Sequence, residues 1–569
     1  MSAVAGRLAS FVGCLCLSAA APSAAAQASR PNAADTTADA RTDRIFAQWD
    51  RTDSPGCAVG VFRDGRIAYA RGYGMANLEL GVALSPQSVL DIGSTSKQFT
   101  AMAVVLLAQR GKLSLDDDVR KYIPEVPVYE RPVTVRHLLT HTSGLRDYLT
   151  LWYLAGIDDA DFTTEAEALD IIRRQKVLNF LPGEQRLYSN SGFFLASVLV
   201  ERVSGQSLAR FAEDQIFRPL GMRHTRFNND HTAIIRGRAT GYARRDGGGY
   251  STSMSDFEQI GDGGVLTSIE DLQRWDENFY SGQVGGRAAL DQLHQRAVLN
   301  SGRTEPFALG LIVDTYRGLR QVRHGGSWAG YRAELMRFPE QHFSVAVLCN
   351  LAGTDPTTLA RRVAEVYLAP SFAAAPEASS PTASAGGSVT LAARDRERYA
   401  GLYRSARTGE LRRVRIRGDS LQLTDLVTAF PLEPVGPDRF RVPGSQPGPE
   451  VRFDASRPSS RQLELLYVSG DTLTFGRVAE AAPTPRDLEA YRGVYWSEEV
   501  GAEYRLEVKD GALVLHRRRS EPVVLAPTYA DAFTARGVLL RFTRARGRVS
   551  EMLVDAGRIR NLRFVRRLD

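Results

Sequence analysis

The chain has 569 residues, of which 43% are hydrophobic and 24% are charged. This is the balance of a globular protein with about three to four domains, and it excludes collagen, a coiled coil and a wholly disordered chain. The formal net charge is +7, and the basic excess lies after residue 390, where 32 Lys and Arg residues face 24 Asp and Glu residues. The arginines are scattered through strand-like stretches without an aromatic-lined basic stripe, so we expect no nucleic-acid partner.

Residues 1–26 have the pattern of a secretory signal peptide. Arg7 precedes a short apolar run at 8–17, and Ala24-Ala25-Ala26 forms a small-residue cleavage site. The run is too short to span a bilayer, and no other stretch is long enough, so we expect no membrane span and a secreted or periplasmic protein. Cys14 loosely fits a lipoprotein signal, but too little apolar sequence precedes it.

Cleavage after residue 26 removes Cys14 and Cys16 and leaves Cys57 and Cys349. Four cysteines are too few for a disulfide scaffold. Both remaining cysteines lie in apolar strand-like runs, and we interpret them as buried thiols rather than as a bridge.

The predicted elements after the signal peptide form a mixed pattern. Residues 27–40 are rich in Ala, Thr and Asp and are predicted to be disordered. A hairpin follows, with strands at 57–62 and 67–73 around Arg63-Asp64-Gly65. Apolar spacing, capping residues and Gly or Pro stops predict helices at 94–110, 188–203, 207–217, from Thr267-Ser268 onward and at 355–367, with strands at 331–338 and 343–350. The fold class expected from this order is α+β, an antiparallel sheet with flanking helices, over residues 42–368.

Beyond residue 370 the chain changes character. Residues 371–392 are rich in Ala, Ser, Pro and Gly and are predicted to be a linker. The tail that follows contains a repeat at an offset of 92, because Tyr399-Ala-Gly-Leu-Tyr403 matches Tyr491-Arg-Gly-Val-Tyr495 without a gap. We expect two small antiparallel β-barrel domains, at 393–482 and 485–569.

The first candidate for chemistry is Ser94-Thr-Ser-Lys97. Residues three apart share a helix face, so Lys97 can reach the Ser94 hydroxyl. Serine is a weak nucleophile until a base takes its proton, and a lysine kept out of water can do so, whereas an arginine cannot. The chain has only five lysines among 72 basic residues, which makes a lysine at this position informative. The alternative is a capped surface helix.

Two further motifs follow in order along the chain. Tyr188-Ser-Asn190 can place a phenol and an amide in one cleft, where a tyrosine near a lysine can shuttle a proton. Taken alone, it is also consistent with a packed tyrosine and a capping asparagine. His324-Gly-Gly326-Ser327 can lie on a strand edge where glycines admit a substrate, or it can be a simple turn.

Together these motifs resemble the class C β-lactamase-like, penicillin-binding serine hydrolases. The resemblance covers about residues 42–368 and extends to the stretches Leu138–Leu145, Pro182-Gly183-Glu184, Pro219–Met222, Gly263–Ser268 and His324–Tyr331. The family has a β-lactamase/transpeptidase-like sheet with a helical subdomain. D-aminopeptidases of the family resemble this chain most in layout, because they also carry two C-terminal barrels.

The resemblance implies a role for each candidate residue. Ser94 is similar to the acylated nucleophile, Lys97 to its activating partner and Tyr188 to the proton-shuttling tyrosine. Asn190, His324, Gly326 and Ser327 are similar to substrate-binding positions, and the backbone N–H groups of Ser94 and Ser327 would form an oxyanion hole. His324 stands where β-lactamases have a lysine, which weakens the case for β-lactam hydrolysis. His141 is expected to be structural.

The function expected from this resemblance is a secreted serine hydrolase that acts through an acyl-enzyme on amide or ester bonds of small peptides containing D-amino acids. The alternatives are an esterase or β-lactamase of the same family, and a non-catalytic penicillin-binding or ligand-sensing protein. We expect a small peptide, ester or β-lactam as substrate, and neither a metal nor a cofactor. The sequence does not define the oligomeric state.

Overall fold

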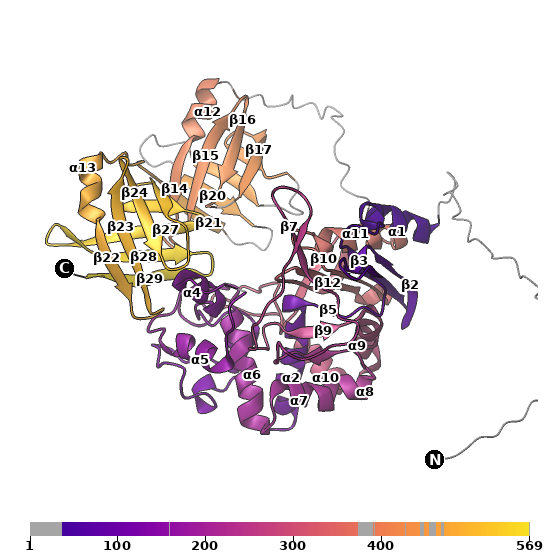
Figure 1. The fold of residues 1–569 in the computed structure, drawn as a ribbon. Helices are drawn as coiled ribbons and strands as arrows, with labels where there is room; N and C mark the ends of the chain where they lie inside the picture. Colours follow the sequence, from indigo (N-terminus) through magenta and orange to yellow (C-terminus); the bar gives the residue numbers. More distant parts are fainter. Residues whose placement is uncertain are drawn as a thin grey trace, which may run out of the picture.

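A computed structural model describes residues 37–158, 160–373, 391, 393–426, 428–443, 449–454, 462–467 and 472–567. The predicted signal peptide and most of the predicted linker lie outside these residues. The described chain forms a main domain, residues 37–373, and two closed barrels (Figure 1). We call them barrel 1, built from β14–β21, and barrel 2, built from β22–β29.

The main domain is built on a six-stranded antiparallel sheet with the order β10-β11-β12-β13-β1-β2. The first two strands are the predicted hairpin, and Asp64 and Gly65 between them both adopt positive φ, at 50° and 72°. The strands are β1 (Cys57–Arg63), β2 (Arg66–Tyr73), β10 (Ile312–Tyr316), β11 (Leu319–Trp328), β12 (Tyr331–Phe338) and β13 (Phe343–Cys349). The N-terminal hairpin thus completes a sheet whose other strands come from the end of the domain.

Helices cover both faces of this sheet and build a separate helical region. Helix α11 (Pro356–Tyr367) packs on β12 and β13 with α1 (Ala38–Phe46) against it, and α9 (Ile269–Ser281) packs on β1 and β13. The helical region contains α2 (Lys97–Gln109), α3 (Val135–Leu139), α4 (Tyr148–Ala155), α5 (Glu165–Arg173), α6 (Asn190–Ser204), α7 (Leu208–Ala212), α8 (Arg218–Leu220) and α10 (Gly286–Leu293). The α+β fold class is confirmed.

Short elements complete the main domain. The 3₁₀ turn η2 (Gly93–Ser96) carries the serine motif, and three further 3₁₀ turns are η1 (Ala47–Trp49), η3 (Val119–Lys121) and η5 (Pro339–Gln341). The small strands are β3 (Met75–Asn77), β4 (Val82–Ala83), β5 (Leu90–Asp91), β6 (Arg226–Phe227), β7 (Tyr242–Arg244), β8 (Tyr250–Thr252) and β9 (Val265–Thr267).

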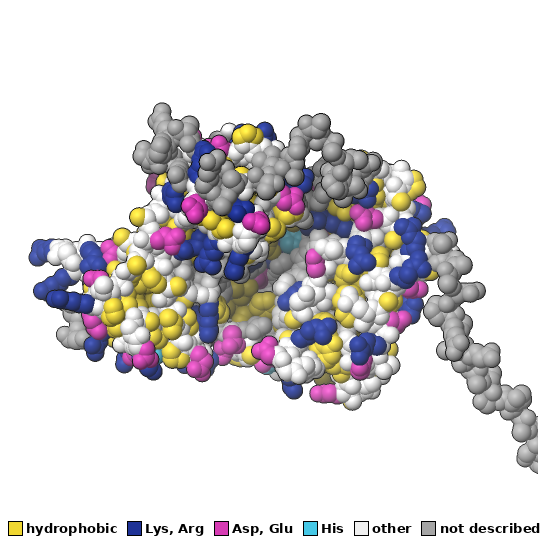
Figure 2. All heavy atoms as spheres, turned by 90° about the horizontal axis from the view of Figure 1, so that it is seen from above, with side chains coloured by type: hydrophobic (Ala, Val, Ile, Leu, Met, Phe, Trp, Pro, Cys, Tyr) yellow, Lys and Arg dark blue, Asp and Glu magenta, His cyan; other side chains and the backbone are white. Residues whose placement is uncertain are grey.

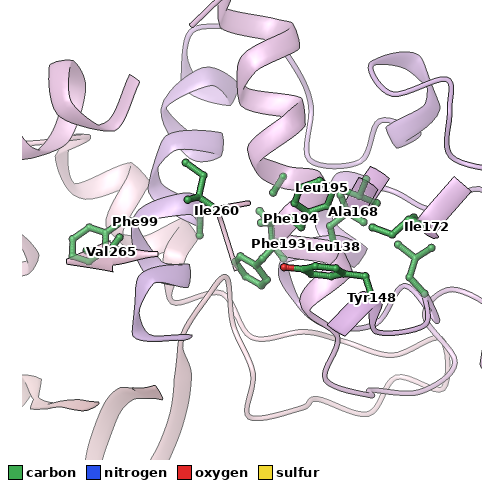
Figure 3. Packing of buried hydrophobic residues seen from close by; sticks show 14 of the residues in the cluster. Phe99, Leu138, Tyr148, Ala168, Ile172, Phe193, Phe194, Leu195, Ile260 and Val265 are labelled. Atoms are coloured by element: carbon green, nitrogen blue, oxygen red, sulfur yellow. The ribbon is translucent and has the colours of Figure 1, made fainter. Parts of the chain in front are cut away.

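One continuous apolar core holds the helical region together. Helices α2 and α6 are buried nearly all round, since residues 97–107 of α2 and 190–200 of α6 are all buried, among them Phe99 and Phe193. Figure 3 shows Phe193 and Phe194 of α6 gathered with Leu138 and Tyr148, which come from two other helices. A fully buried aromatic ring contributes about 1.5–3 kcal/mol, so this packing fixes the ends of α2 and α6 that carry the candidate residues.

Four sequence predictions need correction. Helix α1 begins at Ala38, inside the segment predicted to be disordered, because Thr37 accepts a hydrogen bond from the Ala40 N–H group and caps it. The helix predicted from 188 begins at Asn190 and leaves Tyr188 in the preceding loop. The helix predicted to end at 217 continues through a π-helical turn, η4 (Glu213–Phe217), into α8.

The fourth correction concerns the cysteines. Cys57 and Cys349 stand directly opposite each other on β1 and β13, and they form a disulfide bond rather than two buried thiols. The sequence places each cysteine in a strand, but only the pairing of these strands brings their side chains together.

The two barrels are copies of one eight-stranded design. Barrel 1 contains β14 (Gly401–Arg404), β15 (Leu411–Arg417), β16 (Ser420–Thr424), β17 (Ala429–Gly436), β18 (Arg439–Arg441), β19 (Glu450–Asp454), β20 (Gln462–Leu466) and β21 (Thr472–Val478), after α12 (Ala393–Tyr399). Barrel 2 contains β22 (Gly493–Ser497), β23 (Ala502–Lys509), β24 (Ala512–Arg517), β25 (Val523–Pro527), β26 (Ala532–Ala535), β27 (Val538–Ala545), β28 (Arg548–Ala556) and β29 (Ile559–Arg567), after α13 (Pro485–Leu488) and η6 (Glu489–Tyr491).

The repeat seen in the sequence is also a repeat of contacts. The Tyr403 hydroxyl donates to the carbonyl oxygen of Tyr399 at 2.8 Å, and the Tyr495 hydroxyl donates to that of Tyr491 at 2.8 Å. The predicted pair of antiparallel barrels is confirmed, and both copies keep this hydrogen-bonded tyrosine pair.

Candidate active site

A cleft of about 570 Å³ opens where η2, β11 and the start of α6 meet. This volume lies in the range of small-molecule sites. Six of the seven predicted site residues line the cleft, namely Ser94, Tyr188, Asn190, His324, Gly326 and Ser327. Seen from above in Figure 2, the molecule is hollowed between the barrels and the main domain, and Lys and Arg side chains gather on part of the rim.

Lys97 is the seventh predicted residue, and it lies fully buried beside the cleft. Its ammonium nitrogen lies 3.0 Å from Ser94 Oγ and 2.9 Å from Asn190 Oδ1, and it also donates to the carbonyl oxygen of Asp262. These three acceptors match the three N–H bonds of an ammonium group. A neutral amine would keep the bonds to Asn190 and Asp262 and turn its lone pair to Ser94 Oγ, which is the geometry that proton removal from serine requires.

Asn190 is held in place from the backbone. It is the first residue of α6, and its N–H group donates to Asp147 Oδ1 at 2.6 Å. The other carboxylate oxygen of Asp147 caps α4 by accepting from the N–H group and the hydroxyl of Thr150, at 3.1 and 2.7 Å. Asp147 therefore joins the starts of two helices and fixes the amide that contacts Lys97.

Tyr188 presents an unused hydroxyl. This hydroxyl is buried and has no hydrogen-bond partner among the described residues. The ring stacks on His141 with a centroid distance of 4.1 Å, and its centroid lies 5.1 Å from the Lys97 nitrogen. His141 Nδ1 also contacts the backbone of Ser189, the residue after Tyr188, at 3.2 Å. We infer that the structural role of His141 is to hold the Tyr188 ring in its orientation.

His324 is a neutral acceptor in this cleft. Burial, and after it the nearby charge of Lys97, lowers the pKa of its imidazole to about 3. The Nδ1 atom lies 2.7 Å from the carbonyl oxygen of Gly325, which can only accept, so the ring proton is on Nδ1. Nε2 is then a buried lone pair without a partner among the described residues.

Two glycines let η2 approach the edge of β11. A Cβ atom on Gly326 would lie 1.8 Å from the carbonyl oxygen of Ile92 and 3.1 Å from the backbone nitrogen of Ser94. A Cβ atom on Gly93 would lie 2.7 Å from the backbone nitrogen of Ser327. Only glycine fits at these positions, and the contact brings the Ser94 and Ser327 nitrogens to the same end of the cleft.

The sequence interpretation missed two buried carboxyl groups that line the cleft, Asp91 and Asp262. Burial raises the pKa of each to about 6. Asp91 accepts the N–H group of Gly93 at 2.7 Å, and Asp262 accepts from the Tyr148 hydroxyl at 3.2 Å. Asp262 directly precedes Gly263–Ser268, one of the stretches that carry the family resemblance, and this position could have identified it as a site residue. No sequence pattern identifies Asp91 in the same way.

A third missed residue comes from barrel 2. Arg558, between β28 and β29, lines the cleft with its guanidinium carbon 4.6 Å from the Tyr188 ring centroid. Nothing in the sequence distinguishes this arginine from the other arginines of the basic tail.

The chain is similar to known proteins over its main domain and beyond it. The family model described as beta-lactamase matches residues 42–368. A D-aminopeptidase from Brucella anthropi is 30% identical over 300 residues, which span 52% of this chain and 56% of that protein. A D-aminopeptidase from Cereibacter sphaeroides is 28% identical over 464 residues, which span 80% of this chain and 82% of that protein. The match thus covers little more than half of the first relative and most of the second.

Solved structures show the same fold. The octameric penicillin-binding protein homologue from Pyrococcus abyssi superposes with a TM-score of 0.55 at 24% identity, and covers 77% of this chain and 99% of that one. In the described part of the chain, no helix has both the length and the apolar character that a membrane span requires.

Proposed function

The chain belongs to the beta-lactamase family, and we propose that it hydrolyses amide bonds of short peptides containing D-amino acids through an acyl-enzyme on Ser94. The observation that carries this proposal is the contact of the fully buried Lys97 amine with Ser94 Oγ at 3.0 Å. The preference for D-residues is supported by the D-aminopeptidases among the relatives, one of which aligns over 80% of this chain.

Acylation begins at Ser94. In its deprotonated form the Lys97 amine would take the hydroxyl proton while Oγ forms a bond to the substrate carbonyl carbon. The N–H groups of Ser94 and Ser327 stabilise the oxygen that becomes negative, a contribution of about 3–4 kcal/mol for each such donor. Asn190, held by Asp147, keeps the lysine nitrogen in line with Oγ.

Collapse of the tetrahedral intermediate breaks the C–N bond. The departing nitrogen needs a proton, and the Tyr188 hydroxyl supplies it and is reprotonated from Lys97. Because no described residue pairs with it, the Tyr188 hydroxyl is available for this contact. Water then attacks the acyl carbon of the ester on Ser94 while the Lys97–Tyr188 pair takes a proton from it, and the bond from the acyl carbon to Oγ breaks as the same pair passes that proton to Oγ.

His324 distinguishes this site from one built for β-lactams. A lysine at that position would place a cation in the cleft, whereas neutral His324 offers a lone pair. A lone pair suits an N–H donor on the substrate, as in a peptide or an amine. This is why we place amides ahead of β-lactams, with esters as the second candidate.

We also propose that the protein acts outside the cytoplasm. The support is the disulfide between Cys57 and Cys349, a bond that persists in oxidising compartments. Fractionation of the native host, with detection of the mature N-terminus after residue 26, tests this placement.

The function is tested with three chromogenic substrate classes: D-alanine p-nitroanilide with its L-isomer, p-nitrophenyl acetate, and nitrocefin. We expect the D-anilide to be cleaved fastest. Ser94→Ala and Lys97→Arg are expected to abolish turnover, the second because arginine does not give up its proton. A fluorophosphonate probe should label wild type and not Ser94→Ala. Labelling of neither protein would favour a non-catalytic binding role, and turnover of nitrocefin alone would overturn the amide proposal.

A further inference from the structure

Barrel 2 reaches the active-site cleft with one side chain. Of the described residues that line the cleft, Arg558 alone belongs to a barrel, and it lies in the turn between β28 and β29. Arg558 therefore brings a positive charge to the cleft of Ser94, although the two residues are about 460 positions apart in the sequence.

The turn that carries Arg558 is fixed to the main domain by its backbone. The side-chain amide of Asn179 donates to the carbonyl oxygen of Arg558 at 2.9 Å and accepts the N–H group of Arg560 at 2.8 Å. The guanidinium of Arg146 donates to the carbonyl oxygens of Arg560 and Asn561, both at 3.0 Å. The position of Arg558 is thus set by the interface between the two domains.

The guanidinium of Arg558 has only loose contacts with the described residues, namely the ring of Tyr188 and a long ion pair. Its side chain is 42% exposed and donates no hydrogen bond within the described residues. Its one ion-pair contact is to Asp147 Oδ1 at 3.7 Å, and that oxygen already accepts the N–H group of Asn190 at 2.6 Å. Five N–H donors therefore remain at the cleft for a ligand.

The other arginines of the cleft differ from Arg558. Arg332 donates to the carbonyl oxygens of Ala329 and Tyr331, at 2.9 and 2.6 Å. Arg238 lies in the field of the Asp91 carboxylate, whose pKa it lowers. Arg558 instead lies over the ring of Tyr188, with its guanidinium carbon 4.6 Å from the ring centroid, and Tyr188 protonates the leaving nitrogen in the proposed mechanism.

We propose that Arg558 binds the α-carboxylate of the amino acid that leaves, so that the preferred substrates end in a free carboxylate one residue after the scissile bond. In an α-amino acid the carboxylate is two bonds from the amine, so a leaving nitrogen at Tyr188 places the carboxylate next to the guanidinium. Arginine recognises carboxylates with paired N–H donors. Neutral His324 supplies no competing cation. This inference rests on the proposed peptidase function and specifies its substrate class.

The test compares D-alanyl-D-alanine with D-alanyl-D-alanine amide, which differ only in the terminal charge. We expect wild type to favour the free acid in kcat/KM. In Arg558→Ala we expect the ratio of acid to amide to fall about tenfold to a hundredfold, mainly through a higher KM, the range of a hydrogen-bonded charge pair. Arg558→Lys should retain part of the preference.

Arg548→Ala is the matched control, because Arg548 is an exposed arginine at the start of β28 that does not line the cleft. Thermal unfolding of all variants checks that the barrel stays intact. Binding of the dipeptide to Ser94→Ala and to Ser94→Ala/Arg558→Ala, measured by calorimetry, gives a second readout without turnover.

The outcomes separate the two proposals. Hydrolysis of both substrates with an acid-to-amide ratio that is the same in wild type and Arg558→Ala would overturn the carboxylate site and leave the peptidase function standing. A wild type that prefers the amide would also overturn the carboxylate site. Hydrolysis of neither substrate, nor of the D-anilide, would overturn the peptidase function itself.

Discussion

The guanidinium of Arg146, in the main domain, lies 2.6 Å from the carboxylate of Glu499, in barrel 2, and both side chains are nearly excluded from solvent, at 0% and 9% exposure. Arg146 also accepts the Ser191 hydroxyl on its carbonyl oxygen at 2.6 Å, and the next residue, Asp147, holds the backbone of Asn190. The contact between barrel and main domain is therefore continuous with the support of the active site.

Removing this pair should affect both stability and activity. We expect Arg146→Ala to lower the stability of the docked barrel by about 3–5 kcal/mol, because it leaves the Glu499 charge buried without a partner. The kcat/KM value should fall with it. Urea unfolding and steady-state kinetics measure the two effects.

The neighbouring pair of Lys176 and Glu498 provides the comparison. It also spans the two domains, at 3.0 Å, but its side chains are 69% and 78% exposed. Lys176→Ala should change stability by less than about 1 kcal/mol. Equal effects of the two substitutions would contradict the role given to burial.

Gly326 is the tightest point of the cleft. We expect Gly326→Ala to reduce kcat/KM at least about a hundredfold, because the added methyl group would push η2 away from β11 and misplace the two oxyanion donors. Gly247→Ala is the control, since a Cβ atom there meets nothing within 4 Å. A Gly326→Ala enzyme with wild-type kinetics would show that this contact does not set the geometry.

His324→Lys should shift the substrate range. The substitution replaces a neutral acceptor, whose pKa is about 3, with a cation. We expect faster nitrocefin hydrolysis and slower D-anilide hydrolysis relative to wild type. His324→Gln keeps an acceptor without adding charge and should not gain nitrocefin activity. If both variants gain it equally, the added charge is not the cause.

Asp262 should make stability depend on pH. Its pKa is raised from 3.8 to about 6 by burial, so the folded protein binds this proton more tightly than the unfolded chain does. The stabilisation is complete below pH 3.8 and is lost as pH rises through 6. Between pH 4.5 and pH 8, wild type should therefore lose about 2 kcal/mol of its free energy of unfolding through Asp262, and Asp262→Asn should not show this loss.

Urea unfolding at these two pH values measures the difference. Asp246→Asn, at an exposed position, serves as the reference. A wild type and an Asp262→Asn variant with parallel pH profiles would show that Asp262 is not titrating in this range.

The sequence by itself determined the features that depend on neighbours along the chain. Ser94 and Lys97 are three residues apart, so one turn of helix brings them together, although that turn is 3₁₀ in η2 before α2 begins. The hairpin at Asp64-Gly65 follows from residues that tolerate positive φ. The offset of 92 between Tyr403 and Tyr495 revealed the two barrels because each barrel repeats its own local contacts.

Only the tertiary structure decided which distant residues meet. Cys57 and Cys349 are separated by 292 residues, and their bond exists because β1 pairs with β13 in one particular register. Arg558 is one arginine in a basic tail, and it becomes a cleft residue because Arg146 and Asn179 hold its turn against the main domain. Such contacts depend on how sheets and domains pack, and local sequence patterns carry no information about that packing.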